Sequence, residues 1–237
     1  MNRRFLLASI ASLALANVGA LLVLAAPAPQ KSSAKASAKS SRNTTADPAP
    51  QGSITVDGVK DIDPDKAFGS KNAGLVMEVF SDFQCPACKQ LYTTTLQRVT
   101  DNYVDSNKVY LVHRDFPLPM HAYSRVAASY ARAGCHIGKC EAVEQAIFSN
   151  QEKWEMNGDV KGTVAGALSA AEMKKVEALV EGRTLEPLIE LDLQLGRSVP
   201  VTQTPTSIIH TRDGQSYPVI GYVSYDVLKT LLDQLVK

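Results

Sequence analysis

"FSDFQCPACKQLY", residues 80–92, is the stretch that decides the fold. It places Cys85 and Cys88 three residues apart, with Pro86 just inside the pair. The chain has four cysteines in 237 residues, so two of them at this spacing need a specific explanation. Three explanations compete: half of a metal site, a structural disulfide, or a dithiol that cycles between the reduced and the disulfide form.

The residues on either side of the cysteines predict a strand, a helix and a second strand. "GLVMEVF", residues 74–80, is an apolar run of strand length, typical of a buried central strand. "KVYLVHRDF", residues 108–116, is the second strand, so the pair should be parallel with a right-handed crossover. Between them, apolar residues recur at helical steps on one face, namely Cys88, Tyr92, Leu96, Val99 and Tyr103.

Helices dominate the next eighty or so residues, and strands return near the C-terminus. Helical patterns cover residues 122–134, 141–148, 169–182 and 184–196. Residues 206–211 and 215–221 then form a hairpin around Asp213-Gly214, and a final helix follows Ser224. The fold class is therefore α/β: a domain made of residues 54–117 and 200–237, with an all-helical insertion at 118–199.

The N-terminal residues predict export. Arg3 and Arg4 precede an apolar run, so residues 1–26 read as a signal peptide or, since the run is long enough to span a bilayer, as a membrane anchor. Residues 27–53 are rich in Ala, Ser, Lys and Pro and predict a disordered linker. The formal net charge is +1, and the excess of basic residues lies in these 53 residues without interleaved aromatics, which argues against nucleic-acid binding.

Three of these segments resemble one known family. "FSDFQCPAC" after a strand, "HRDFPLPMH" on the next strand and "TPT" before a terminal hairpin are similar to the DsbA-like thioredoxin-fold thiol–disulfide oxidoreductases, over about residues 54–237. The resemblance implies a thioredoxin-like fold with a helical insertion, and disulfide exchange with protein substrates. It also implies a monomer without cofactor or metal in the periplasm or another extracytoplasmic compartment, re-oxidised by a DsbB-like or VKOR-like membrane partner.

The cysteine spacing itself favours redox chemistry. With Cys85 at the N-cap of a helix, Pro86 takes the first helical position and Cys88 the third. Cys85 then faces the positive end of the helix dipole, which favours the nucleophilic thiolate. The intervening Pro86-Ala87 is neither the Pro-His of strong oxidants nor the Gly-Pro of thioredoxins, so Ala87 predicts a less oxidising pair than Pro-His would give. A disulfide-forming oxidant is favoured; a reductase or isomerase, and a non-catalytic binding or chaperone-like module with a structural disulfide, are the alternatives.

The resemblance assigns two further elements to the site. It implies that the Thr204-Pro205 bond is cis and lies against the cysteines, where the Thr204 backbone can pair with an extended substrate. It also implies that Glu78, on the strand, lies beneath the cysteines and moves the proton of the buried thiol. The alternative for Glu78 is that strand alternation simply turns its side chain to solvent on one face of the sheet.

The remaining candidates have simpler explanations. A zinc or copper site at Cys85 and Cys88 would need further ligands, and proline beside a helix-opening cysteine favours redox use. Cys135 and Cys140 form either a second, structural disulfide, which requires a helix break at Gly138, or two core thiols. Three further residues are interpreted as structural. His113 and Asp115 are polar residues at the end of a strand, and Trp154 is a packing anchor of the insertion.

Overall fold

The computed structural model describes residues 54–199 and 201–236. The predicted signal or anchor (1–26) and the linker (27–53) lie outside the described residues. Among the helices of the described part, none combines the length and the apolar character needed to cross a membrane.

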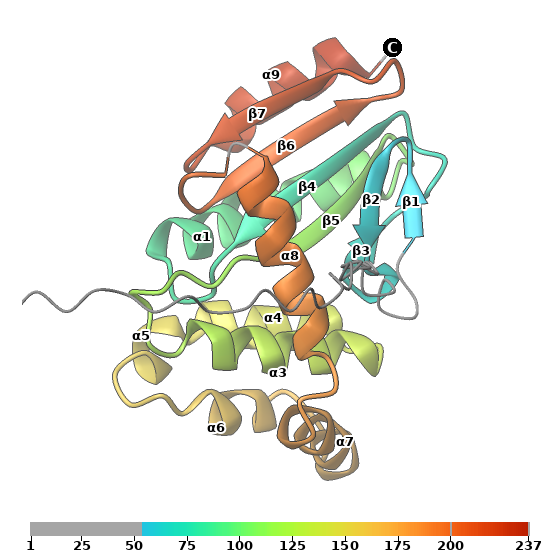
Figure 1. The fold of residues 1–237 in the computed structure, drawn as a ribbon. Coiled ribbons are helices and arrows are strands. Elements are labelled where there is room, and N and C mark those ends of the chain that lie inside the picture. The colour runs from blue at the N-terminus through green and yellow to red at the C-terminus, as the bar shows by residue number, and fades with distance from the viewer. Residues whose placement is uncertain (1–53, 200, 237) are drawn as a thin grey trace, which may run out of the picture. The chain divides into compact units, whose positions relative to one another are not determined.

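A five-stranded sheet forms the centre of the domain (Figure 1). β4 runs parallel to β5, and every other neighbouring pair is antiparallel. β4 is the middle strand and six of its seven residues are buried, which confirms the central strand predicted from its apolar run. In spatial order the strands are β3 (Ala67–Phe68), β5 (Val109–Asp115), β4 (Leu75–Ser81), β6 (Thr206–Thr211) and β7 (Ser216–Ile220).

A continuous helical segment connects β4 to β5 and covers one face of the sheet. The predicted apolar side of this segment is buried, from Cys88 to Tyr103. α9 (Tyr225–Leu235) packs beside α2 and η2 on the same face. The segment consists of α1 (Pro86–Gln90), the π-helical η2 (Leu91–Leu96), α2 (Gln97–Val99) and the π-helical η3 (Thr100–Val104).

The insertion consists of helices, as predicted, and its last helix returns to the sheet. α8 crosses the face of β4 and β5 opposite to α1 (Figure 1). Gly196 permits this contact, because a Cβ there would lie 2.4 Å from the ring of Phe116 and 3.1 Å from that of Phe80. The helices of the insertion are α3 (Ser124–His136), α4 (Cys140–Ser149), α5 (Gln151–Trp154), α6 (Val160–Ala165), α7 (Ala170–Glu181) and α8 (Glu186–Ser198).

A hairpin at the start of the described chain was not predicted. β1 (Ile54–Val56) and β2 (Val59–Ile62) pair antiparallel, and η1 (Pro64–Lys66) follows them. The hairpin buries a small core against the α8 side of the sheet, formed with Val76 and Val112. It thereby covers part of the sheet that α8 leaves open.

Candidate active site

The two cysteines open helix α1 in the arrangement that their spacing predicts. Cys85 is the N-cap residue with extended backbone angles (φ −80°, ψ 121°), and Pro86 and Cys88 lie in the first turn. Both cysteines are free thiols. Cys88 is 1% exposed and Cys85 is 8% exposed, so the first cysteine is the one that a reactant can approach.

The two thiols differ strongly in acidity. The pKa of Cys85 is lowered to about 5, first by a hydrogen bond from the Cys88 thiol and further by the N–H groups of Cys88 and Ala87 at the positive helix end, although burial opposes this. Burial raises the pKa of Cys88 well above its ordinary value, and so does the neighbouring Cys85. Near neutral pH, Cys85 is therefore a thiolate and Cys88 a protonated thiol that donates to it.

The Thr204–Pro205 segment lies beside Cys85. The peptide bond between Thr204 and Pro205 is cis. The Cys85 Sγ is 3.5 Å from the carbonyl oxygen of Thr204. The hydroxyl of Thr204 is buried and helps to lower the pKa of Cys85, and it has no other hydrogen-bond partner among the described residues. The structure thus brings together Cys85, Cys88, Thr204 and Pro205.

Asp82, within the cysteine motif, is a site residue that the sequence reasoning missed. Its backbone N–H donates to the Sγ of Cys88 over 3.4 Å. Its carboxylate is fully buried and ties the cysteine loop to the start of the insertion. It accepts four hydrogen bonds, from Gln84 N (2.7 Å), Leu118 N (2.7 Å), His121 Nδ1 (2.8 Å) and Ser124 Oγ (2.6 Å).

The expectation that Glu78 lies beneath the cysteines is wrong. Side chains alternate along β4, so Glu78 shares the α8 face with Phe80, whereas Val79 lies on the face toward Cys88. Glu78 is 7% exposed and accepts hydrogen bonds from Arg114 Nε and His210 Nε2, each at 2.8 Å. Burial alone would raise the pKa of Glu78, but the bonds from His210 and Arg114 lower it. Glu78 is therefore ionised and belongs to a buried network of ion pairs on the α8 face of the sheet, opposite to Cys88.

The polar groups that do lie beneath Cys88 come from η1, β5 and α4. A cavity of about 10 Å³, near the size needed for one water molecule, is lined by Cys88, Ser81 and a cluster of charged side chains. In this cluster, Lys66 Nζ lies 2.5 Å from Asp115 and 3.3 Å from Glu144, and His113 Nδ1 lies 2.7 Å from Glu144. His113 and Asp115 therefore belong to a buried polar cluster rather than to a pair with Cys85.

Cys135 and Cys140 are joined by a disulfide that connects α3 to α4. Gly138 has φ +75°, a left-handed conformation that glycine adopts without steric cost, and it ends α3 at the break that such a bridge requires. Trp154 is buried, and its Nε1 donates to the carbonyl of Ile147 over 2.7 Å.

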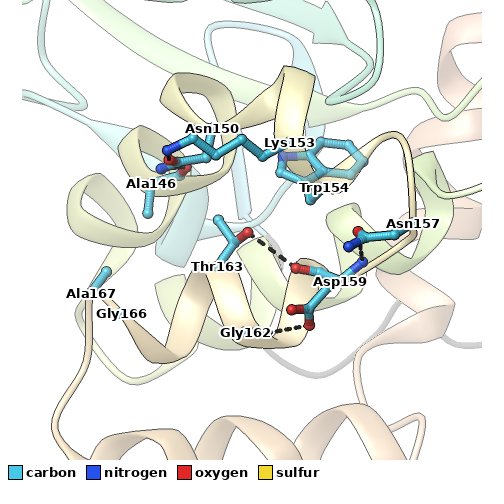
Figure 2. Close-up of a pocket in the computed structure, with 10 residues that line it drawn as sticks. All are labelled: Ala146, Asn150, Lys153, Trp154, Asn157, Asp159, Gly162, Thr163, Gly166 and Ala167. Atoms are coloured by element: carbon cyan, nitrogen blue, oxygen red, sulfur yellow. Dashed lines mark hydrogen bonds between the residues drawn. The ribbon is translucent and has the colours of Figure 1, made fainter.

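The insertion also holds a pocket of about 430 Å³ between α4, α5 and α6, with Trp154 on its wall (Figure 2). Polar groups of Asn157, Asp159 and Gly162, which line this pocket, form hydrogen bonds with one another. The Asp159 carboxylate accepts from Gly162 N over 2.8 Å, and Asp159 N donates to Asn157 Oδ1 over 2.9 Å (Figure 2). Neither Cys85 nor Cys88 lines this pocket.

Two curated relatives share parts of the sequence. A protein of Rickettsia bellii described as a protein-disulfide oxidoreductase is 21% identical over 160 residues, which are 65% of this chain and 60% of that protein. Disulfide bond formation protein D of Bacillus cereus is 36% identical over 52 residues, 22% of this chain and 24% of that protein. The alignments thus span less than two thirds of these curated relatives.

Solved structures share the fold. Alpha-DsbA1 of Wolbachia pipientis matches with a TM-score of 0.61 at 18% identity, covering 72% of this chain and 90% of that one. Oxidised BdbD of Bacillus subtilis matches with a TM-score of 0.61 at 17% identity, covering 72% and 92%. The predicted thioredoxin-like fold with a helical insertion is therefore confirmed. A family model described as thioredoxin matches residues 62–234, and the chain accordingly belongs to the thioredoxin family.

Proposed function

We propose that this protein is an exported thiol–disulfide oxidoreductase that introduces disulfides into protein substrates through Cys85 and Cys88. One observation carries the proposal: the Cys85 thiol, at the N-terminus of a helix and 3.5 Å from the Thr204 carbonyl, has its pKa lowered to about 5, while its partner Cys88 stays protonated. A thiol of this acidity is a good leaving group and, when reduced, a stable thiolate.

The reaction exchanges one disulfide for another. A substrate thiolate attacks the Sγ of Cys85 in the Cys85–Cys88 disulfide, and the electron pair of the broken bond goes to Cys88. The second substrate thiolate then attacks the substrate sulfur of the mixed disulfide, and Cys85 leaves as a thiolate. Two electrons pass from the substrate dithiol to the cysteine pair. The two substrate thiols release two protons, of which one ends on Cys88 and the other goes to solvent.

The acidity of Cys85 sets the direction. Thioredoxin, with a thiol pKa of about 7, has a potential of about −270 mV, and DsbA, with about 3.5, has about −120 mV. One pKa unit corresponds to about 30 mV in the reduction potential of the pair. For a pKa of about 5, extrapolation from DsbA gives a potential of about −165 mV, and extrapolation from thioredoxin gives about −210 mV. The pair is then a moderate oxidant, weaker than the Pro-His form.

The surroundings of Cys85 suit a protein substrate. The backbone of Thr204 lies against Cys85, where an extended substrate segment can pair with it. Re-oxidation of the cysteines then requires an electron acceptor, for which a DsbB-like or VKOR-like membrane protein has the appropriate chemistry. Export by residues 1–26 would place the reaction in the periplasm or another extracytoplasmic compartment, where disulfides persist.

Refolding of a reduced, disulfide-containing protein tests the proposal. The wild type, oxidised beforehand, should restore the native disulfides stoichiometrically, and Cys85→Ser should not. When a disulfide-containing substrate replaces the reduced one, Cys88→Ser should accumulate a mixed disulfide, because its Cys85 thiolate attacks the substrate disulfide and the resolving thiol of Cys88 is missing. Full activity of Cys85→Ser would leave only a structural role for the Cys85–Cys88 bond. A measured potential near that of thioredoxin would select the reductase alternative.

A further inference from the structure

The side chain of Gln151 connects the helical insertion to the backbone of the reactive cysteine. Gln151 is the first residue of α5 and is 2% exposed. Its Nε2 donates to the carbonyl oxygen of Phe83 over 2.6 Å and to that of Cys85 over 3.2 Å. Both hydrogens of one amide group are therefore directed at the cysteine loop, from a position 66 residues further along the chain.

The carbonyl of Cys85 has a particular importance for this loop. Because the next residue is Pro86, the peptide between them has no N–H, and its carbonyl is its only hydrogen-bonding group. This carbonyl also accepts from the backbone N–H groups of Cys88 and Lys89 in the first turn of α1, each over 3.1 Å. The orientation of that peptide sets the ψ angle of Cys85, which is 121°. It therefore sets how the Sγ of Cys85 is directed toward the N–H groups at the helix end, which help to lower its pKa.

The short helix α5 that carries Gln151 makes two further contacts with the rest of the domain. Trp154, in the same short helix, is buried and donates to Ile147, and it forms a wall of the pocket in Figure 2. Glu152 pairs with Lys89 of α1 over 2.9 Å. A buried amide on such a support acts as a fixed donor rather than as a side chain that adapts to the loop.

We propose that Gln151 is a positioning residue for the thiol–disulfide reaction: its amide, bonded to the carbonyls of Phe83 and Cys85, acts together with the first turn of α1 to fix the Cys85–Pro86 peptide, so that the Cys85 thiolate stays aligned with its hydrogen-bond donors. The inference rests on the proposed function, because it assigns a role in setting the acidity of the same cysteine. It gives the insertion a direct part in the chemistry, in addition to any contact with substrates.

The test replaces Gln151 by Leu, which keeps the bulk of the side chain and removes the donor. The matched control is Gln145→Leu on α4, since Gln145 bonds only with Gln97 and Ser149 in the described structure. Thiolate absorbance against pH should show the pKa of Cys85 raised by about half a unit to one unit in Gln151→Leu and unchanged in the control. The equilibrium with glutathione should shift about three- to tenfold toward the protein disulfide.

A second variant separates positioning from stability. Gln151→Glu keeps the shape but turns acceptor oxygens toward two carbonyls, so it should raise the pKa of Cys85 at least as much as Leu does. A pKa and a glutathione equilibrium like those of the wild type in either folded variant would overturn the proposal, as would loss of the fold in both. The proposed function fails separately, if the wild-type Cys85 itself titrates like an ordinary cysteine.

Discussion

The hydrogen bond from the Cys88 thiol is the largest cause of the low pKa of Cys85, and its removal should be measurable. A hydrogen bond to a charged group contributes about 1.5–3 kcal/mol, and one pKa unit corresponds to ~1.4 kcal/mol. Cys88→Ala should therefore raise the pKa of Cys85 by about 1–2 units, from about 5 to about 6–7. Cys88→Ser retains a hydroxyl donor at the same place, so its Cys85 pKa should stay near the wild-type value.

Two measurements on the reduced proteins report this change. Ultraviolet absorbance of the thiolate gives the titration directly. The rate of alkylation at about pH 5.5 reports the fraction of Cys85 that is thiolate. This fraction is about three quarters if the pKa of Cys85 is about 5, and about a quarter or less if the pKa is about 6 or higher. In the wild type, Cys88 is buried and its raised pKa keeps it from reacting, so the rate reports Cys85.

The comparison of the two variants decides the outcome. If Cys88→Ala keeps a pKa near 5, the hydrogen bond is not the cause, and the helix N-terminus must supply the shift. If Cys88→Ser rises as far as Cys88→Ala, the effect comes from the altered packing around residue 88 rather than from the loss of a donor. Either result would refute the assignment of the acidity of Cys85 to a hydrogen bond from Cys88.

Four further predictions follow from the same structure. Since the pKa of Cys85 is lower in the folded than in the unfolded protein, ionisation of this thiol stabilises the reduced protein above about pH 5, and the oxidised protein lacks this contribution. Chemical denaturation should therefore show that the unfolding free energy of the reduced protein, relative to that of the oxidised protein, falls by about 2 kcal/mol between pH 7 and pH 5. Arg132→Met removes the cation that three buried carboxylates share and should cost about 3–5 kcal/mol in urea denaturation. Gly196→Ala should lower the unfolding free energy by about 1–3 kcal/mol, because the added methyl meets aromatic rings, whereas Gly166→Ala, in ordinary contact, should not. Glu78→Gln should leave the Cys85 pKa and the exchange rate unchanged while lowering the melting temperature; a slower exchange would return Glu78 to the reaction.

Local patterns predicted the elements that local chemistry determines. The helix after Cys85 begins where proline and the cysteine spacing place it, and its apolar face is buried as its period requires. Helix α7 (Ala170–Glu181) likewise lies within the helical pattern predicted for residues 169–182, and Ser169 caps its start. The β1–β2 hairpin had a usable signal, Asp57-Gly58, whose two positive φ angles suit a tight hairpin turn, but its strands are too short to show a clear period.

The rest of the site depends on contacts between distant parts of the chain. Three of the four partners of the Asp82 carboxylate lie 36 to 42 residues downstream, and Gln151 reaches back 66 residues to Cys85, so no local window of sequence contains these contacts. Glu78 shows a different limit. A one-residue change in position along a strand moves a side chain to the other face, so a correct strand assignment still put the wrong side chain beneath Cys88.

The size of the shift at Cys85 shows why these distant contacts matter. A pKa lowered from 9.0 to about 5 corresponds to about 5 kcal/mol in favour of the thiolate. A charge at a helix N-terminus typically gains about 0.3–1 kcal/mol from the dipole, and about 2 kcal/mol in favourable buried geometry. The larger part must then come from hydrogen bonds whose donors are held in place. Asp82 and Gln151 connect the backbone around the cysteines to the insertion, so the insertion helps to hold those donors in place.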